Sequence, residues 1–145
     1  LYSKLVIKMN NKNKIFIDKL RSSGLRPTNQ RVDISRFLFN RKKTFHFTVE
    51  ELKNSMNLKR SKKISTATFY NTVHALKSAG YLKEFSLENN TSYYDTNITS
   101  HHHFFDNGKV IDIKSDKITF NKLPEAPKGK KIKNVEVVIR LENNN

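Results

Sequence analysis

Three adjacent histidines, His101, His102 and His103, are the side chains of this sequence best suited to hold a metal ion. On a strand, alternate residues share a face, so His101 and His103 would converge while His102 points the other way. Further nitrogen and oxygen ligands could come from three residues elsewhere in the chain: His46, Asp95 and Asp112. Such a set suits Zn, Fe or Mn, and imidazole also binds haem iron. The alternative is a solvated loop of histidines without an ion.

The sequence contains no cysteine. Disulfides, zinc sites built on thiolates, iron–sulfur clusters and a catalytic thiol are therefore excluded. A metalloenzyme built on the histidines would also need a paired catalytic carboxylate and an apolar segment that forms a pocket, and the sequence offers neither. We therefore expect a protein that is not an enzyme.

A second group of reactive side chains lies on a helix predicted from Ser65 or Thr66 to residue 79, with Gly80 as its left-handed stop. Apolar residues at positions 69, 73 and 76 should face the core. The opposite face gathers hydroxyl, phenol, amide, imidazole and ammonium groups, which donate to phosphates and read base edges. These residues are Thr66, Tyr70, Asn71, His74 and Lys77. The alternative is a solvated polar face, but the basic run at 59–63 before the helix favours nucleic acid.

The distribution of charge points to the same kind of partner. Lysine and arginine number 28 against 13 acidic residues, which gives a formal net charge of +15. Residues 1–85 carry +14 of this charge and residues 86–145 only +1. A polyanion partner for the first part follows, and nucleic acid is the commonest one. A general enrichment in lysine and asparagine is the alternative, but it would have made the second part basic too.

Helix signals dominate the first part of the chain. A helix from about residue 14 should end at Ser22-Ser23-Gly24, and Thr28 can cap a second helix. Thr48 followed by Glu51 forms a capping box that opens a third, short helix. After Gly80, residues 81–87 and 91–94 flank a turn at 88–90 and predict a β-hairpin. Helices followed by a hairpin in a basic unit of about 80 residues describe a winged helix.

The second part is typical of strands. Residues 109–113, 117–120 and 135–141 are rich in β-branched side chains, and Asn107-Gly108 is a hairpin signal. Pro124 and Pro127 exclude a long helix before the last strand. Three or four short strands bury too little to be stable alone, so we expect this part to pair with a second copy of the chain.

These elements predict an α+β protein, in which a winged-helix DNA-binding domain precedes a small, mixed α/β dimerisation domain dominated by strands. We expect a poorly ordered extension at 1–13, the winged helix at 14–88, the end of the wing and a hinge at 89–100, and the dimerisation domain at 101–145. No apolar stretch approaches the ~20 residues of a membrane span. The N-terminal sequence also lacks a secretion signal, although Met9 could be the true start. We therefore expect a cytoplasmic protein with no membrane partner.

Three motifs resemble the ferric uptake regulator (Fur) superfamily: residues 24–31 (GLRPTNQR), residues 46–52 (HFTVEEL) and residues 65–72 (STATFYNT). Residues 92–97, 101–105 and 135–141 are similar to the iron response regulator (Irr) branch of that superfamily. The resemblance implies operator binding as a homodimer on double-stranded DNA. It also implies DNA contacts from Arg26 and Tyr70. Together with the polar face of the predicted helix, it leads us to expect DNA contacts from Arg26, Thr66, Thr68, Tyr70, Asn71 and His74. Asn71 stands where the family often has Arg, so the base preference should differ.

The resemblance also implies a regulatory site between reading head and dimerisation domain. Its expected ligands for metal or haem are His46, Asp95, His101, His102, His103 and Asp112. Irr-like proteins are implied to bind haem through such histidines and to lose DNA affinity when haem is plentiful. We therefore expect a regulator of iron and haem homeostasis, controlled by haem or by Fe, Mn or Zn. The alternatives are a plain divalent-metal-sensing repressor of the Fur type and a structural nucleic-acid-binding protein without a ligand.

Overall fold

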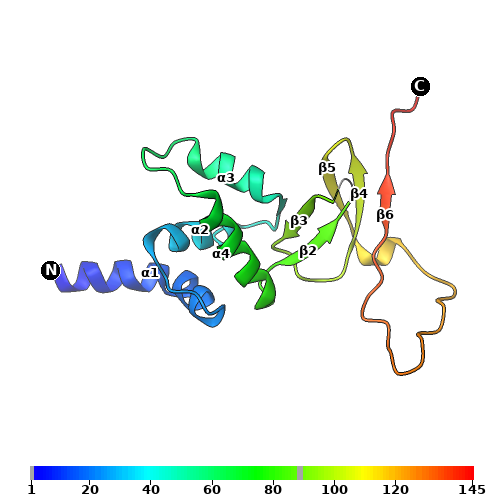
Figure 1. Ribbon diagram of the computed structural model, residues 1–145, viewed down its shortest axis with the longest axis horizontal. Helices are drawn as coiled ribbons and strands as arrows, with labels where there is room; N and C mark the ends of the chain where they lie inside the picture. Colours follow the sequence, from blue (N-terminus) through cyan, green and yellow to red (C-terminus); the bar gives the residue numbers. More distant parts are fainter. Residues whose placement is uncertain (1, 88–89) are drawn as a thin grey trace. The chain divides into compact units, whose positions relative to one another are not determined.

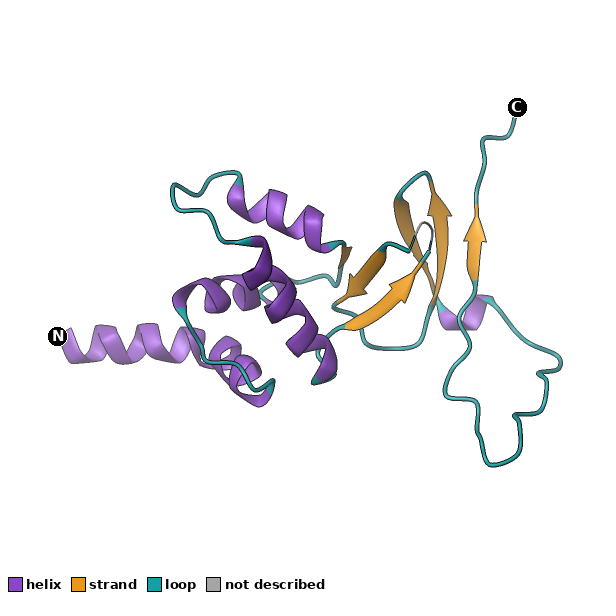
Figure 2. Ribbon diagram, in the orientation of Figure 1, coloured by secondary structure: helices purple, strands orange, loops and turns teal. Residues whose placement is uncertain are grey.

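The computed structural model describes residues 2–87 and 90–145, which form two units, Leu1–Ile98 and Thr99–Asn145 (Figure 1). The first unit combines helices with a small sheet, and the second is built on a separate sheet (Figure 2). The first unit contains, in chain order, α1 (Tyr2–Ser22), α2 (Asn29–Phe39), β1 (His46–Phe47), α3 (Val49–Asn57), α4 (Thr66–Ser78), β2 (Lys83–Ser86) and β3 (Ser92–Asp95). This order of helices followed by a hairpin confirms the predicted α+β winged-helix class.

The helices begin at the caps that the sequence predicts. The Thr28 hydroxyl accepts the Arg31 N–H at the start of α2. At the start of α3, Thr48 accepts the Glu51 N–H at 3.1 Å, and the Glu51 carboxylate accepts the Thr48 N–H in return. Such a box satisfies two of the N–H groups that a helix start leaves without partners. Gly80, with φ at +86°, ends the segment after α4 as predicted.

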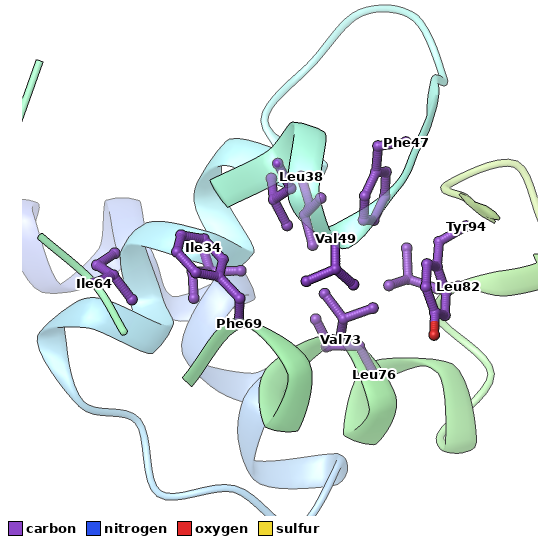
Figure 3. Packing of buried hydrophobic residues seen from close by; sticks show 11 residues of the cluster. Ile34, Leu38, Phe47, Val49, Ile64, Phe69, Val73, Leu76, Leu82 and Tyr94 are labelled. Carbon is purple, nitrogen blue, oxygen red and sulfur yellow. The ribbon is translucent and has the colours of Figure 1, made fainter. Parts of the chain in front are cut away.

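The core of the first unit lies where α4 packs against α1, α2 and α3. Phe69, Val73 and Leu76 are fully buried, as their helical spacing predicts, and they join a cluster with Ile34 and Leu38 of α2. Figure 3 shows these side chains together with residues of α3 and of the strands. Burying each large apolar side chain contributes about 1.5–3 kcal/mol to folding. The burial therefore fixes which face of α4 points inward.

A three-stranded antiparallel sheet, in the order β1-β3-β2, completes this unit. The predicted hairpin is formed by β2 and β3, in which Glu84 pairs with Tyr94. The turn expected at 88–90 falls largely on residues 88 and 89, which lie outside the described residues. The two-residue strand β1 is too short to be predicted from its sequence. It pairs with β3 so that His46 lies opposite Asp95.

The second unit contains β4 (His102–Asp106), β5 (Lys109–Ile113), the 3₁₀ turn η1 (Ser115–Lys117) and β6 (Val138–Arg140). Its sheet has the order β5-β4-β6, with β5 antiparallel and β6 parallel to β4. Asn107 and Gly108 connect β4 to β5 with φ angles of +45° and +86°. Positive φ at both central residues identifies the hairpin turn that the Asn-Gly pair predicts.

Two predictions about the second unit are wrong in part. The strand expected at 117–120 is absent, because the Lys117 N–H donates to the Lys114 carbonyl and closes the 3₁₀ turn instead. The strand expected over 135–141 is shorter and covers only Val138–Arg140. The Val137 N–H donates to a side chain, Nδ1 of His102, so the backbone ladder does not extend past this residue.

The N-terminal helix α1 covers most of the segment 1–13 for which the sequence predicts poor order. Its last turn carries Lys19 and Arg21, whose positive charges favour the negative end of the helix dipole. Within the described residues, α1 and the other helices are too polar or too short to cross a bilayer.

Candidate nucleic-acid interface and metal centre

One face of α4 is exposed and polar, as the sequence predicts. Ser65 caps the helix by accepting the Thr68 N–H, and the buried residues of the opposite face hold the helix on the core. This arrangement leaves four of the predicted DNA-contacting residues exposed to solvent: Thr66, Tyr70, Asn71 and His74. Because α4 follows α3 across the connection 58–65, it takes the place of the second helix of a helix-turn-helix with a lengthened turn, the helix that enters a major groove.

Tyr70 is the most prominent side chain of this face, with 43% of its surface exposed. Its ring meets the His74 imidazole edge to face, with 6.0 Å between the centroids. A phenol combines an apolar ring that can stack with a hydroxyl that both donates and accepts hydrogen bonds. The pair therefore offers stacking and hydrogen bonding on one patch.

Thr68 differs from its neighbours on α4. Its hydroxyl lies 2.9 Å from the Ser65 hydroxyl, and the side chain is half-buried. These contacts give Thr68 a place in the helix cap. Its predicted contact with DNA stays a prediction.

Arg26 lies in the loop before α2, where its side chain is exposed. Its carbonyl accepts hydrogen bonds from the Thr28 N–H at 2.9 Å and from the Arg31 guanidinium at 3.0 Å. These bonds fix the backbone of the loop while the Arg26 guanidinium remains in contact with solvent. Such a loop suits a contact to a phosphate or a groove edge.

The basic run at 59–63 divides into structural and exposed residues. The Arg60 guanidinium is paired with the Asp33 carboxylate at 3.0 Å, which ties the turn before α4 to α2. Lys63 donates to the Asn57 carbonyl. Lys59 and Lys62 are exposed and add positive charge beside the start of α4.

A hollow of about 440 Å³ lies between α4, the start of α3 and the hairpin. Its walls include Tyr70 and His74 from α4, Thr91 and Ser92 from the hairpin, and Thr48 from α3. The sequence does not reveal this hollow, because it forms only when the hairpin folds back beside the helix. Hydroxyl groups on three elements thus surround the same space beside the exposed face of α4.

The second unit brings His101, His103 and Asp112 together. The two imidazole Nε2 atoms lie 3.0 Å apart. Oδ1 of Asp112 lies 3.3 Å from Nε2 of His101 and 3.5 Å from Nε2 of His103. His101, directly before β4, and His103, within it, converge on the same side, as predicted. The Asn107-Gly108 turn sets the register that places Asp112 opposite His103.

The chemistry of this cluster fits a divalent metal ion. His101 Nδ1 lies 2.8 Å from the Thr99 carbonyl oxygen. Because a carbonyl only accepts, Nδ1 carries the proton and Nε2 presents its lone pair to the cluster, the arrangement usual for metal-binding histidines. Ligands at about 2.0–2.1 Å from a tetrahedral ion lie about 3.3 Å from one another. The three separations observed, 3.0–3.5 Å, are close to that value.

His46 and Asp95 form a separate pair in the first unit, facing each other across β1 and β3. Asp95 is buried, and its Oδ1 accepts the Asn97 N–H at 2.8 Å. The His46 ring meets the Phe85 ring edge to face at 6.3 Å. That this pair joins the three residues of the second unit in one site stays a prediction.

His102 points away from its two neighbours in the run. Its Nδ1 accepts the Val137 N–H at 3.0 Å, and its ring lies edge-on to Phe120 with 6.0 Å between the centroids. The side chain is almost completely buried. The alternation along β4 could be predicted from the sequence, but the partner, 35 residues further along the chain, could not.

Comparisons with known proteins agree with this architecture. The model of the ferric uptake regulator family matches residues 22–140. The peroxide-responsive repressor PerR of Staphylococcus epidermidis is 34% identical over 98 residues, which span 66% of this chain but only 63% of that relative. The ferric uptake regulation protein of Synechococcus elongatus is 33% identical over 104 residues, 69% of this chain and 70% of that protein.

Solved structures show the same fold at lower identity. The ferric uptake regulator from Pseudomonas aeruginosa with manganese is 17% identical, with a TM-score of 0.62 over 88% of this chain and 97% of that one. The Vibrio cholerae ferric uptake regulator is 18% identical, with a TM-score of 0.61 over 86% and 96%. The predicted place within the Irr branch stays a prediction. Because the family model matches most of this chain, residues 22–140, the chain belongs to the ferric uptake regulator family.

Proposed function

We propose that this chain is a transcription regulator that binds double-stranded DNA through α4. The observation that carries the proposal is the division of α4 into a fully buried apolar face and an exposed face with Tyr70, Asn71 and His74. Hydroxyl, amide and imidazole groups on the second helix of a helix-turn-helix are placed to reach base edges in the major groove. We propose no enzymatic activity.

The charge distribution supports DNA as the partner. Residues 1–85 hold nearly all of the net charge of +15, and Arg26, Lys59 and Lys62 are exposed among them. Neutralising several phosphates releases counterions and makes binding strongly dependent on salt. A basic unit of this size is therefore suited to rapid, electrostatically steered association with DNA.

We further propose that the second unit forms a homodimer. A sheet of three short strands is marginal on its own, and this one exposes apolar side chains, among them Ile111, Ile139 and Leu141. A second copy of the chain would cover such surface and place two reading heads on one DNA duplex. The operator should then contain two half-sites related by a two-fold axis.

Control of DNA binding by a divalent metal at His101, His103 and Asp112 is the third part of the proposal. Two imidazoles and a carboxylate are suitable for Fe, Mn or Zn. The names of relatives support a metal, since one is a ferric uptake regulation protein and a solved neighbour contains manganese. His46 and Asp95 belong to this proposal as further ligands.

Haem is the ligand that the sequence resemblance favours, and it makes a different demand on the histidines. Two imidazoles on opposite sides of a haem iron stand about 4 Å apart, with the porphyrin between them. The Nε2 atoms of His101 and His103 are 3.0 Å apart. The geometry therefore favours a single small ion over haem held by this pair, and haem control would need a rearranged site.

The test is selection of binding sites from a random duplex library, followed by affinity measurements with metal-free protein and with added Mn²⁺, Zn²⁺ or haem. The proposal expects a palindromic sequence, dimer binding and an affinity that changes with a divalent metal. The His101→Ala/Asp112→Ala variant should keep DNA binding but lose the metal response. Binding without sequence preference would indicate a structural nucleic-acid-binding protein instead. A specific haem absorbance shift, accompanied by DNA release, would make haem the ligand.

A further inference from the structure

The three histidines of the run divide into two functions, because β4 alternates its side chains between two faces. His101 and His103 direct their Nε2 atoms toward Asp112. His102, between them, is buried on the other face and accepts a backbone hydrogen bond from Val137 at 3.0 Å. A ring nitrogen that accepts this bond replaces the carbonyl that a neighbouring strand would supply.

Val137 is held at both of its backbone polar groups. Its N–H donates to the His102 side chain, and its carbonyl accepts the His103 N–H at 3.0 Å. These bonds lie where the chain enters β6, and the Leu141 N–H, which donates to Phe105, closes the other end of the strand. The segment 118–137 that leads to β6 contains a single turn and no helix or strand. No helix or strand immediately before β6 therefore determines where it begins.

His103 belongs to both sets of contacts. Its side chain lies in the candidate metal cluster, while its backbone N–H holds Val137. We propose that His102 is a positioning residue that fastens β6 to β4, so that ordering of His101 and His103 by a divalent cation is coupled to the seating of the C-terminal strand. The coupling rests on the proposed metal site. The fastening itself rests only on the contacts of His102 and Val137.

Coupling of this kind is reciprocal. A cation that restricts His101 and His103 stabilises the backbone on both sides of His102 and thereby protects the Val137 hydrogen bond. A firmly seated β6 in turn holds the two ligands in place and raises the affinity for the cation by the same factor. Loss of a residue that only supports ligands typically lowers metal affinity 10- to 100-fold.

The experiment measures amide exchange of residues 137–141 by NMR in the full-length chain, together with Zn²⁺ and Mn²⁺ affinity. Two matched substitutions separate the nitrogens of the ring. His102→Asn places an acceptor oxygen where Nδ1 lies, and His102→Gln places one where Nε2 lies. Without metal, His102→Ala should accelerate exchange at Val137 about 2- to 10-fold, the equivalent of one ordinary hydrogen bond. Asn should restore protection and Gln should not.

With metal, wild-type protein should show slower exchange at Val137, and His102→Ala should not. The metal affinity of His102→Ala should be about 10-fold lower than that of wild type, and His102→Asn should restore it. His101→Ala, which removes a ligand, should lower the metal affinity more than 100-fold. Unchanged Val137 exchange in metal-free His102→Ala would overturn the fastening. Metal binding that leaves Val137 exchange unchanged in wild type would overturn the coupling. If His102→Gln keeps the metal affinity and His102→Asn loses it, His102 is a metal ligand and the positioning role is wrong. If wild type binds no metal, the proposed regulation fails, while the metal-free comparison still tests the fastening.

Discussion

Substitution of Tyr70 by alanine separates DNA recognition from stability, because this residue lies on the outer face of α4. Its side chain is 43% exposed, and its described ring contact is the edge-to-face pair with His74 at 6.0 Å. An aromatic pair of this kind contributes about 0.5–1.5 kcal/mol in favourable surroundings, and less where water reaches it. We therefore expect the free energy of unfolding to fall by less than about 1 kcal/mol. Phe69→Ala, at the neighbouring buried position, should cost about 3–5 kcal/mol.

The effect on DNA binding should be much larger than the effect on folding. A side chain that contacts a base contributes about 1–3 kcal/mol, and a homodimer carries two copies. The loss per dimer is then about 2–6 kcal/mol, which is a fall in specific affinity of at least about 30-fold. Tyr70→Phe should recover the part that comes from stacking and leave the part that comes from the hydroxyl.

Fluorescence anisotropy with the selected operator, measured over a range of salt concentrations, gives affinity and salt dependence together. Tyr70 is uncharged, so its removal should leave the slope of log K against log [salt] unchanged. Arg26→Gln should lower the slope by about 0.9 for each phosphate contact that is lost. Ile15→Ala, which shortens another exposed helical side chain, is the control and should change neither quantity.

The reasoning is refuted if Tyr70→Ala binds its operator as tightly as wild type while remaining folded. The exposed face of α4 would then be a solvated surface, and sequence would be read elsewhere. A parallel loss of specific and non-specific affinity, with the salt slope unchanged, would also contradict a base contact. It would place Tyr70 against the phosphate backbone.

Three further predictions concern single contacts. Thr48→Ala removes the cap of α3 and should lower the free energy of unfolding by about 1 kcal/mol in urea titrations, whereas Thr48→Ser should keep it. Hydrogen bonds from Lys77 and Ser92 hold the pKa of Glu84 below its usual value. The resulting stability is present above pH 4.5 and is lost as the pH falls through the lowered pKa. Acid unfolding of Glu84→Gln should therefore lack a contribution of about 0.2–1 kcal/mol, and identical acid limbs would count against this pair. Asp112→Ala should weaken Zn²⁺ and Mn²⁺ binding more than tenfold in calorimetry, while unfolding without metal changes by less than about 0.5 kcal/mol. Unaltered metal affinity would exclude Asp112 as a ligand.

Local signals predicted most of the first unit. The caps at Thr28 and Thr48 and the stop at Gly80 each depend on a few neighbouring residues, and the structure confirms all three. The buried face of α4 follows from helical spacing alone. The strand at His46 could not be predicted from local signals, because two residues form a strand only when β3 is present to pair with them.

The candidate metal site could be predicted only in part for the same reason. Alternation along a strand predicts that His101 and His103 converge, and the hairpin turn brings Asp112 near them. The Thr99 carbonyl that orients His101 belongs to an irregular segment, which no periodic pattern describes. The contact from His102 to Val137 joins residues far apart in the chain, and the strand ending there is shortened by it. Predictions from sequence fail here because backbone groups pair with side chains.

The turn between β4 and β5 has a consequence for how related sequences can diverge. Side chains alternate along a strand, so adding or deleting one residue at Asn107-Gly108 would exchange the two faces of β5 relative to β4. Ile111 or Ile113 would then occupy the position of Asp112, and a carboxylate would be replaced by a hydrocarbon. Substitutions in this turn change the stability of the turn. A change in the length of the turn would move the Asp112 carboxylate out of the cluster although Asp112 itself is still present. Insertions and deletions here should therefore be rarer among metal-responsive relatives than in the long connection before β6.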